Sequence, residues 1–205
     1  MENYANLMFT AAVAAEQETV GTRALYAEKY PARTKPGLGA DERAFLETRT
    51  SIYMASVSET GWPYVQHRGG PLGFLKVLDA ETIAFADYRG NRQFISKGNL
   101  LGDDRVSVFA MDYPQKARLK LQGHASMIDA TDDPDLAKKL ITPGSGRVER
   151  LTTIRIVAFD WNCPQFITPR YTQDEVTAMV APHLAERDRK IEDLTQRLTA
   201  LGETQ

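Results

Sequence analysis

Three short segments of this sequence concentrate the side chains that could bind a ligand. PYVQHRGGP (63–71) ends an extended stretch with His-Arg-Gly-Gly, so two hydrogen-bond donors stand beside backbone that a ligand can approach closely. DYRGNRQFISKGN (87–99) places two arginines and a lysine among amides and hydroxyls at a predicted strand-to-helix junction. This density of donors suits a phosphate, because guanidinium groups and helix N-terminal amides both bind phosphate oxygens. DWNCPQFITPR (160–170) combines Trp, Cys, Phe and Arg directly after a predicted strand.

Each of these side chains also has a purely structural interpretation. Arg89 and Arg92 suit surface ion pairs, and His67 suits a hydrogen-bonded structural role. Trp161 suits a core position, and Cys163 suits a small buried apolar residue. A barrel brings strand ends to shared rims, so the occurrence of all three segments beside predicted strands favours a common binding site.

Several well-known catalytic and nucleotide-binding motifs are absent from the sequence. PGLGAD (36–41) lacks the third glycine and the preceding strand of a dinucleotide fingerprint. No H-E-x-x-H, C-x-x-C or Walker loop occurs, and the three histidines are far apart. The single cysteine excludes an internal disulfide framework and a cysteine-rich zinc site. We therefore expect no metal site.

Length and charge restrict the class of protein further. The chain has 205 residues and a net charge of −2, which gives no basic excess for binding nucleic acid. No apolar run approaches the roughly 18 residues that a membrane-spanning helix needs. The N-terminus reads Met1-Glu2-Asn3, which lacks the basic start of a secretory signal. We expect a single cytoplasmic domain that binds neither nucleic acid nor membrane.

The pattern of apolar residues predicts a largely β structure. Residues 3–20 read as one helix, and a second helix is predicted after Asp41. Six or seven strand-like stretches with short connections follow between residues 50 and 161. This spacing favours a closed or nearly closed antiparallel barrel. Helix-like stretches at 92–101 and 133–141 interrupt the strands.

The C-terminal stretch from Gln173 to Leu201 is strongly helical, with an interruption predicted at Pro182. Apolar residues repeat there every seven positions, at Leu184, Ile191 and Leu198, with Leu194 and Leu201 beside them. Arg187 occupies a position where the repeat calls for an apolar residue. The stripe suits a helix packed on its own barrel; the alternative is a contact between two copies of the chain.

The sequence resembles the pyridoxamine 5′-phosphate oxidase-like family of FMN-binding split barrels, and within it a bacterial branch of predicted flavin-nucleotide-binding proteins. The similar segments are YMASVSETGWPYVQHRGGPLGFLKVLD, AFADYRGNRQFISKGNL, RVSVFAMDY, RLKLQGHA and DWNCPQFITPR. The resemblance implies a mainly β (α+β) fold: a six-stranded antiparallel Greek-key split barrel with flanking N- and C-terminal helices. Its parts would be a helical lead-in (1–48), the barrel (49–170) and a C-terminal helix (171–205). It also implies a homodimer that binds FMN at the interface.

The resemblance assigns residues to the flavin position by position. The strand after the Gly-x-Pro turn supplies Gln66, His67 and Arg68, and the next lining strand supplies Phe85, Ala86 and Asp87. The phosphate-binding turn supplies Asn91, Arg92 and Gln93, with Ser96 and Lys97 as helpers. Arg118 corresponds to a ring-binding position, and Trp161 and Arg170 correspond to C-terminal contacts. His67 is the candidate proton donor near the ring.

Two departures from the true oxidases concern the substrate. ITPRYTQDE (167–175) replaces the Arg-x-His-Asp-Arg-like run that binds pyridoxal phosphate, and Pro71 replaces a lysine of the family. The resemblance therefore implies an FMN-dependent oxidoreductase acting between a nicotinamide or small organic molecule and an acceptor, with the substrate left open. The alternatives are a non-catalytic flavin-binding or sensing module, and a split barrel that uses deazaflavin or haem.

Overall fold

A computed structural model describes residues 1–142 and 146–202 of the protein. Two compact units make up the chain. The first, the barrel unit, comprises Met1–Asp112 and Lys116–Gln165. The second, the C-terminal unit, comprises Tyr113–Gln115 and the chain from Phe166 onward.

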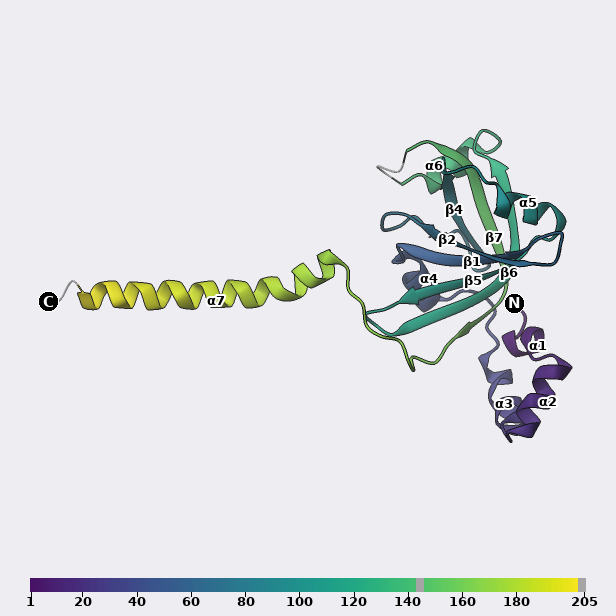
Figure 1. Cartoon of the computed structure of the whole chain (residues 1–205), viewed down its shortest axis with the longest axis horizontal. Coiled ribbons are helices and arrows are strands. Elements are labelled where there is room, and N and C mark those ends of the chain that lie inside the picture. Colours follow the sequence, from purple (N-terminus) through teal and green to yellow (C-terminus); the bar gives the residue numbers. More distant parts are fainter. Residues whose placement is uncertain (143–145, 203–205) are drawn as a thin grey trace. The chain divides into compact units, whose positions relative to one another are not determined.

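A seven-stranded antiparallel sheet forms the barrel unit over the described residues, in the order β2-β1-β5-β6-β7-β4-β3 (Figure 1). The strands are β1 (Ser51–Val57), β2 (Pro63–Gly69), β3 (Lys76–Val77), β4 (Thr82–Tyr88), β5 (Arg105–Asp112), β6 (Ala117–Asp129) and β7 (Val148–Trp161). This confirms the predicted mainly β, antiparallel split barrel with flanking helices. The resemblance implies six strands, and the described residues form seven. The additional strand is β3, a two-residue strand at the edge of the sheet that pairs with β4.

Alternation of apolar and polar residues explains which strand faces are buried. In β1, Ile52 and Met54 are fully buried, whereas Tyr53 between them is exposed. In β6, Leu119 and Leu121 are fully buried, and their neighbours are only partly covered. Successive side chains point to opposite faces of a strand, so each strand gives one face to the core.

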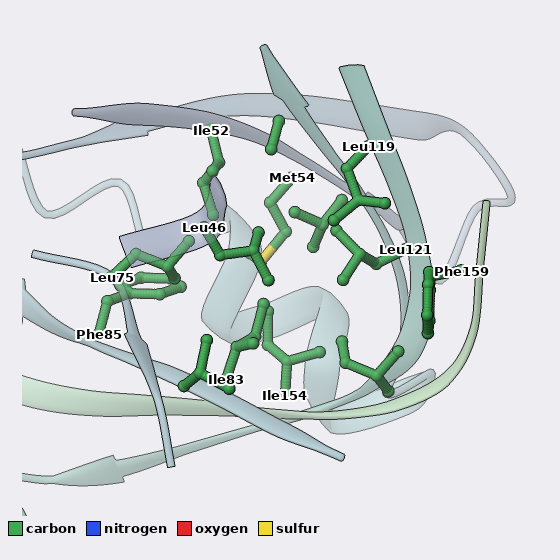
Figure 2. Close-up of a cluster of buried hydrophobic side chains, with 14 of the residues drawn as sticks. Leu46, Ile52, Met54, Leu75, Ile83, Phe85, Leu119, Leu121, Ile154 and Phe159 are labelled. Carbon is green, nitrogen blue, oxygen red and sulfur yellow. The ribbon is translucent and has the colours of Figure 1, made fainter. Parts of the chain in front are cut away.

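The core fills the space enclosed by the curved sheet. Figure 2 shows its side chains converging from several strands, with Leu46 entering from helix α4 (Ala40–Glu47). The labelled members are Leu46, Ile52, Met54, Leu75, Ile83, Phe85, Leu119, Leu121, Ile154 and Phe159. A smaller apolar cluster lies against helix α6 (Pro134–Leu140) and includes Leu140 and Leu151. Burial of this apolar surface is the main stabilising contribution to the fold.

The remaining helices are α1 (Tyr4–Met8), α2 (Ala11–Thr19), α3 (Arg23–Lys29), the 3₁₀ helix η1 (Pro31–Arg33), α5 (Ile95–Gly102) and α7 (Gln173–Gly202). The single helix predicted over 3–20 is wrong. The Thr10 hydroxyl accepts a hydrogen bond from the Val13 amide and begins a second helix there. The interruption predicted at Pro182 is also wrong, because α7 continues through it. None of the helices described is long and apolar enough to cross a bilayer.

Replacement of Gly123 by alanine should destabilise the barrel. Gly123 lies where the β6–β7 register shifts, and an added Cβ would lie 2.6 Å from the Arg155 carbonyl oxygen and 2.9 Å from Ile154 Cγ2. Overpacking of this kind costs about 1–3 kcal/mol of unfolding free energy. Urea denaturation measures the loss. Gly98→Ala is the matched control, because no atom lies within 4 Å of its added Cβ and alanine favours a helix interior. Equal stability of Gly123→Ala and wild type would contradict this packing.

Candidate functional site

A cleft of about 260 Å³ opens between β2, the end of β4 and the turn that leads into α5. Eight of the predicted ligand-binding residues line it: Gln66, Arg68, Asp87, Asn91, Arg92, Gln93, Ser96 and Lys97. Strands β6 and β7 contribute Met127 and Arg150. The structure thus brings together residues from four separate stretches of the sequence, and four of the five charged groups that line the cleft are cations.

Asp87 holds two guanidinium groups at this cleft. Its Oδ1 accepts a hydrogen bond from Arg68 Nη1 (2.8 Å), and its Oδ2 accepts one from Arg150 Nε (2.9 Å). The three side chains are only 11–13% exposed. Arg150 lies directly opposite Asp87 in the β4–β7 pairing, whereas Arg68 comes from β2 near the other end of the sheet order. The Arg68–Asp87 ion pair therefore joins two strands that are not paired neighbours.

The Arg68–Asp87–Arg150 network contains one hydrogen-bond donor that no described residue satisfies. The Arg68 Nε is buried and makes no hydrogen bond within the described part of the chain. An unpaired buried donor costs roughly 1–3 kcal/mol, so an acceptor supplied by a ligand would be favourable here. This observation shows that the donor set of the cleft is not saturated by the protein.

A second ion-pair group lies at the rim of the cleft. Arg92 Nη2 donates to Glu149 Oε1, Arg89 Nε lies 3.8 Å from the same oxygen, and Arg150 Nη1 lies 3.6 Å from Glu149 Oε2. The hydrogen bond from Arg92 holds the pKa of Glu149 below its usual value, and the charges of Arg150 and Arg89 contribute. Arg92 thus makes the ion pair that its structural interpretation predicts, at a residue that also lines the cleft.

The turn before α5 has unusual backbone geometry. Arg92 and Phe94 have φ angles of 59° and 57°, in the left-handed region that side chains other than glycine seldom adopt. Phe94 is the residue before α5, and no side chain of the described residues caps the first amides of that helix. The Ser96 hydroxyl donates to Gln66 Oε1 (2.7 Å) and attaches the helix start to β2. Strained turns of this type concentrate at ligand-binding sites, and uncapped helix amides attract anions.

The other β2 and β4 residues of the prediction line a neighbouring hollow. His67, Phe85 and Ala86 lie there, and Arg68 and Asp87 line both spaces. The His67 ring packs edge-on against Tyr53, with 5.7 Å between centroids. Phe85 belongs to the buried core, so only part of this predicted set is available to a ligand within one copy of the chain.

Three predicted ligand-binding residues lie outside both hollows. Trp161 packs edge-on against Phe45, and its Nε1 donates to Glu42 Oε1 (2.7 Å). Arg118 Nε donates to the Cys163 carbonyl oxygen (3.1 Å).

Arg170 lies in the C-terminal unit, with its guanidinium 5.0 Å from the centre of the Tyr113 ring.

The core position of Trp161 agrees with its structural interpretation. Cys163 is exposed, so the interpretation of this thiol as a buried apolar residue is wrong.

Two charged residues of the site were missed by the sequence analysis. Glu149 and Arg150 lie between the helix-like stretch at 133–141 and the last predicted strand, with no motif around them. Their place at the cleft depends on the pairing of β4 with β7, more than 60 residues apart in sequence. The local signal is weak, because Glu149 and Arg150 are adjacent and do not alternate with apolar residues at the start of the strand.

A family sequence profile described as pyridoxamine 5′-phosphate oxidase matches residues 38–156, which is more than half of the chain. The chain belongs to this family. The matched range includes every residue that lines the cleft.

Several solved structures are similar to this chain at low sequence identity. HupZ of Group A Streptococcus is 14% identical, with a TM-score of 0.50, covering 65% of this chain and 99% of its own. An FMN-binding protein from Syntrophomonas wolfei is 12% identical (TM-score 0.44; 72% and 97% covered). A protein of the pyridoxinephosphate oxidase family from Clostridium acetobutylicum, related to general stress protein 26, is 11% identical (TM-score 0.45; 60% and 85% covered). No curated protein matches the sequence.

Replacement of Asp87 by asparagine should destabilise the barrel strongly. It would leave the nearly buried Arg68 without its counter-charge and Arg150 with only the 3.6 Å contact to Glu149, and breaking a buried pair costs about 3 kcal/mol or more. Chemical denaturation measures the change. Asp129→Asn is the control, because the carboxylate of Asp129 is 59% exposed in its pair with Lys97 and should contribute about 0–1 kcal/mol. Similar losses for the two variants would contradict the bridging role of Asp87.

Proposed function

We propose that this protein binds FMN at the cleft and acts as an FMN-dependent oxidoreductase between a nicotinamide or small organic molecule and an acceptor. The observation that carries the proposal is the convergence of four cations and the uncapped start of α5 on one cleft. Bound FMN would supply a ring that accepts or donates a hydride. Family membership supports a flavin-type ligand, and the substrate stays open.

Charge supports a phosphate ester at the turn. Arg68, Arg92, Lys97 and Arg150 line the cleft with one carboxylate, Asp87, and Glu149 at the rim adds a second. Arg89 beside Glu149 and Asp129 beside Lys97 add one charge of each sign, so five cations against three carboxylates leave two net positive charges. A phosphate monoester carries about 1.5 to 2 negative charges at pH 7, so its charge balances the net positive charge of the cleft.

Different residues of this chain would bind different parts of the ligand. Arg92, Lys97 and the α5 amides suit the phosphate, because they combine charge with several donors at the rim. Asp87 fixes the directions of Arg68 and Arg150 and prevents the two cations from repelling each other. Gln66 is oriented by Ser96 and presents an amide to the same space.

We also propose a homodimer, because the family resemblance places the flavin between subunits. Arg118, Trp161 and Arg170 lie outside the cleft of their own chain, and a second copy is the source from which such residues could reach the flavin. Light scattering should give about twice the chain mass of 22.9 kDa. A monomer mass that does not change on addition of FMN would overturn the dimer.

Purified protein should contain FMN and not FAD. The turn at residues 87–99 offers one compact phosphate site, and the sequence has no dinucleotide fingerprint for an adenylate. The absorption spectrum and chromatography of the released cofactor test this expectation. Release of FAD, a haem spectrum, a deazaflavin or a colourless protein would each overturn it. Bleaching of the flavin by NADH or NADPH then distinguishes an oxidoreductase from a module that only binds flavin.

Arg92→Ala should weaken FMN binding roughly 10- to 150-fold, since one charge-assisted contact to phosphate contributes about 1.5–3 kcal/mol. Titration of wild type and variant with FMN measures the change. Riboflavin lacks the phosphate and should bind both proteins equally. Arg92→Lys should recover only part of the affinity, because an ammonium cannot bind two oxygens as a fork.

Two further variants make the Arg92 experiment specific. Arg105→Ala is the matched control, because Arg105 pairs with Asp103 and does not line the cleft. Glu149→Gln removes the carboxylate that competes with a phosphate for Arg92 and should strengthen FMN binding. Equal losses of FMN and riboflavin in Arg92→Ala would show that Arg92 supports the fold or the ring and not the phosphate.

A further inference from the structure

Helix α7 exposes an apolar stripe along its length. It runs for 30 residues, about 45 Å at 1.5 Å per residue. Every described side chain from Gln173 to Leu201 is exposed, including Ile191 (53%) and Leu198 (70%). Helices in water derive most of their stability from packing an apolar face. A stripe of this length therefore calls for a partner.

The stripe follows a heptad repeat from residue 177 to residue 201. The a positions are Thr177, Leu184, Ile191 and Leu198, and the d positions are Val180, Arg187, Leu194 and Leu201. Six of these eight residues are apolar. Pro182 falls at an f position, on the side opposite to the seam. A repeat of apolar a and d residues over three to four heptads is typical of a coiled coil.

The charges beside the stripe select the orientation of two paired helices. The g positions are His183, Lys190 and Arg197, and the e positions are Ala181, Asp188 and Thr195, of which Asp188 carries a negative charge. In an antiparallel pair, g residues face g residues, so Lys190 would oppose Arg197 of the second copy. In a parallel pair, g faces e, so His183 would lie opposite Asp188 of the second copy. The parallel arrangement therefore avoids the contact between Lys190 and Arg197, and it sets the two Arg187 residues at the d position opposite each other.

The residues at the seam also favour two strands. Ile191 at a with Leu194 at d is the combination that selects parallel dimers. Arg187 interrupts the seam at a d position, and its Nε donates to Asp188 Oδ1 at 3.0 Å. A single polar residue in a seam lowers stability but fixes register, because other registers leave it against an apolar residue.

We propose that α7 pairs with α7 of a second copy of this chain as a parallel, in-register, two-stranded coiled coil. This interface is separate from the cleft and does not depend on flavin binding. The second copy is the occupant that fits the heptad, the g and e charges and the Ile191–Leu194 combination in one heptad. Packing of α7 against the barrel of its own chain, and pairing with a different protein, are outcomes that the experiment can reveal.

Cysteine cross-linking of the full-length chain tests the pairing and its direction. In a Cys163→Ser background, Leu184→Cys and Leu198→Cys each place one thiol at an a position, and Gln196→Cys places one at an f position. A parallel, in-register pair brings equivalent a residues face to face, within the Cα separation of about 4.4–6.8 Å that disulfides need. We expect both a-position variants to form covalent dimers under mild oxidation at least tenfold faster than the f-position variant.

Several results would overturn the proposal. Equal rates at the a and f positions would indicate random collision, and no cross-linking at either a position would indicate that α7 packs elsewhere. Efficient cross-linking between Leu184→Cys and Leu201→Cys chains, without same-site products, would indicate an antiparallel pair. A covalent product that contains a different protein would indicate another partner.

A charge placed in the seam provides the second test. Leu194→Glu should abolish cross-linking of Leu198→Cys, whereas Gln196→Glu, outside the seam, should leave it unchanged. Arg187→Leu should make the cross-linking more resistant to urea, because it completes the apolar seam. Persistent cross-linking in Leu194→Glu would overturn the coiled coil. Flavin content and the circular dichroism of the barrel report on the folded cleft, so failure here is distinguishable from failure of the proposed function.

Discussion

The bridge from Arg68 through Asp87 to Arg150 is the interaction on which the candidate site depends. It connects β2, β4 and β7, although β2 and β4 lie near opposite ends of the sheet order. Charges this little exposed are costly unless they are paired, so the bridge is favoured only when the sheet has curved enough to bring these strands together. Assembly of the cleft therefore depends on closure of the barrel.

The cleft combines two kinds of cation that differ in their freedom. Arg68 and Arg150 are nearly buried and fixed by Asp87, whereas Arg92 is half exposed and pairs with Glu149 at the rim. A fixed group costs little to organise when a ligand binds, and an exposed ion pair contributes about 0–1 kcal/mol and is easily exchanged. The rim can thus give up its internal pair to an anion while the inner bridge stays intact.

Helix α7 follows different physical rules from the barrel. The barrel buries its apolar residues within one chain, whereas the apolar stripe of α7 is exposed within its own unit. The family profile ends at residue 156, before this helix begins. The heptad of α7 was visible in the sequence because a helical repeat is a local pattern. Which helix packs against the apolar stripe depends on association between chains, and therefore on the charged residues and the a and d residues of α7.

The sequence by itself determined the antiparallel strands, the strand-to-helix turn and most of the residues that line the cleft, because alternation, turn residues and clustered donors are local signals. It also determined the heptad of α7. Tertiary structure alone decided that Glu149 and Arg150 join the site, since the β4–β7 register brings them beside Asp87 from a distant part of the chain. The tertiary structure also decided that Trp161 packs on the core and that Arg118 donates a hydrogen bond to the Cys163 carbonyl oxygen. These contacts join residues that are far apart in the sequence, so no single segment encodes them.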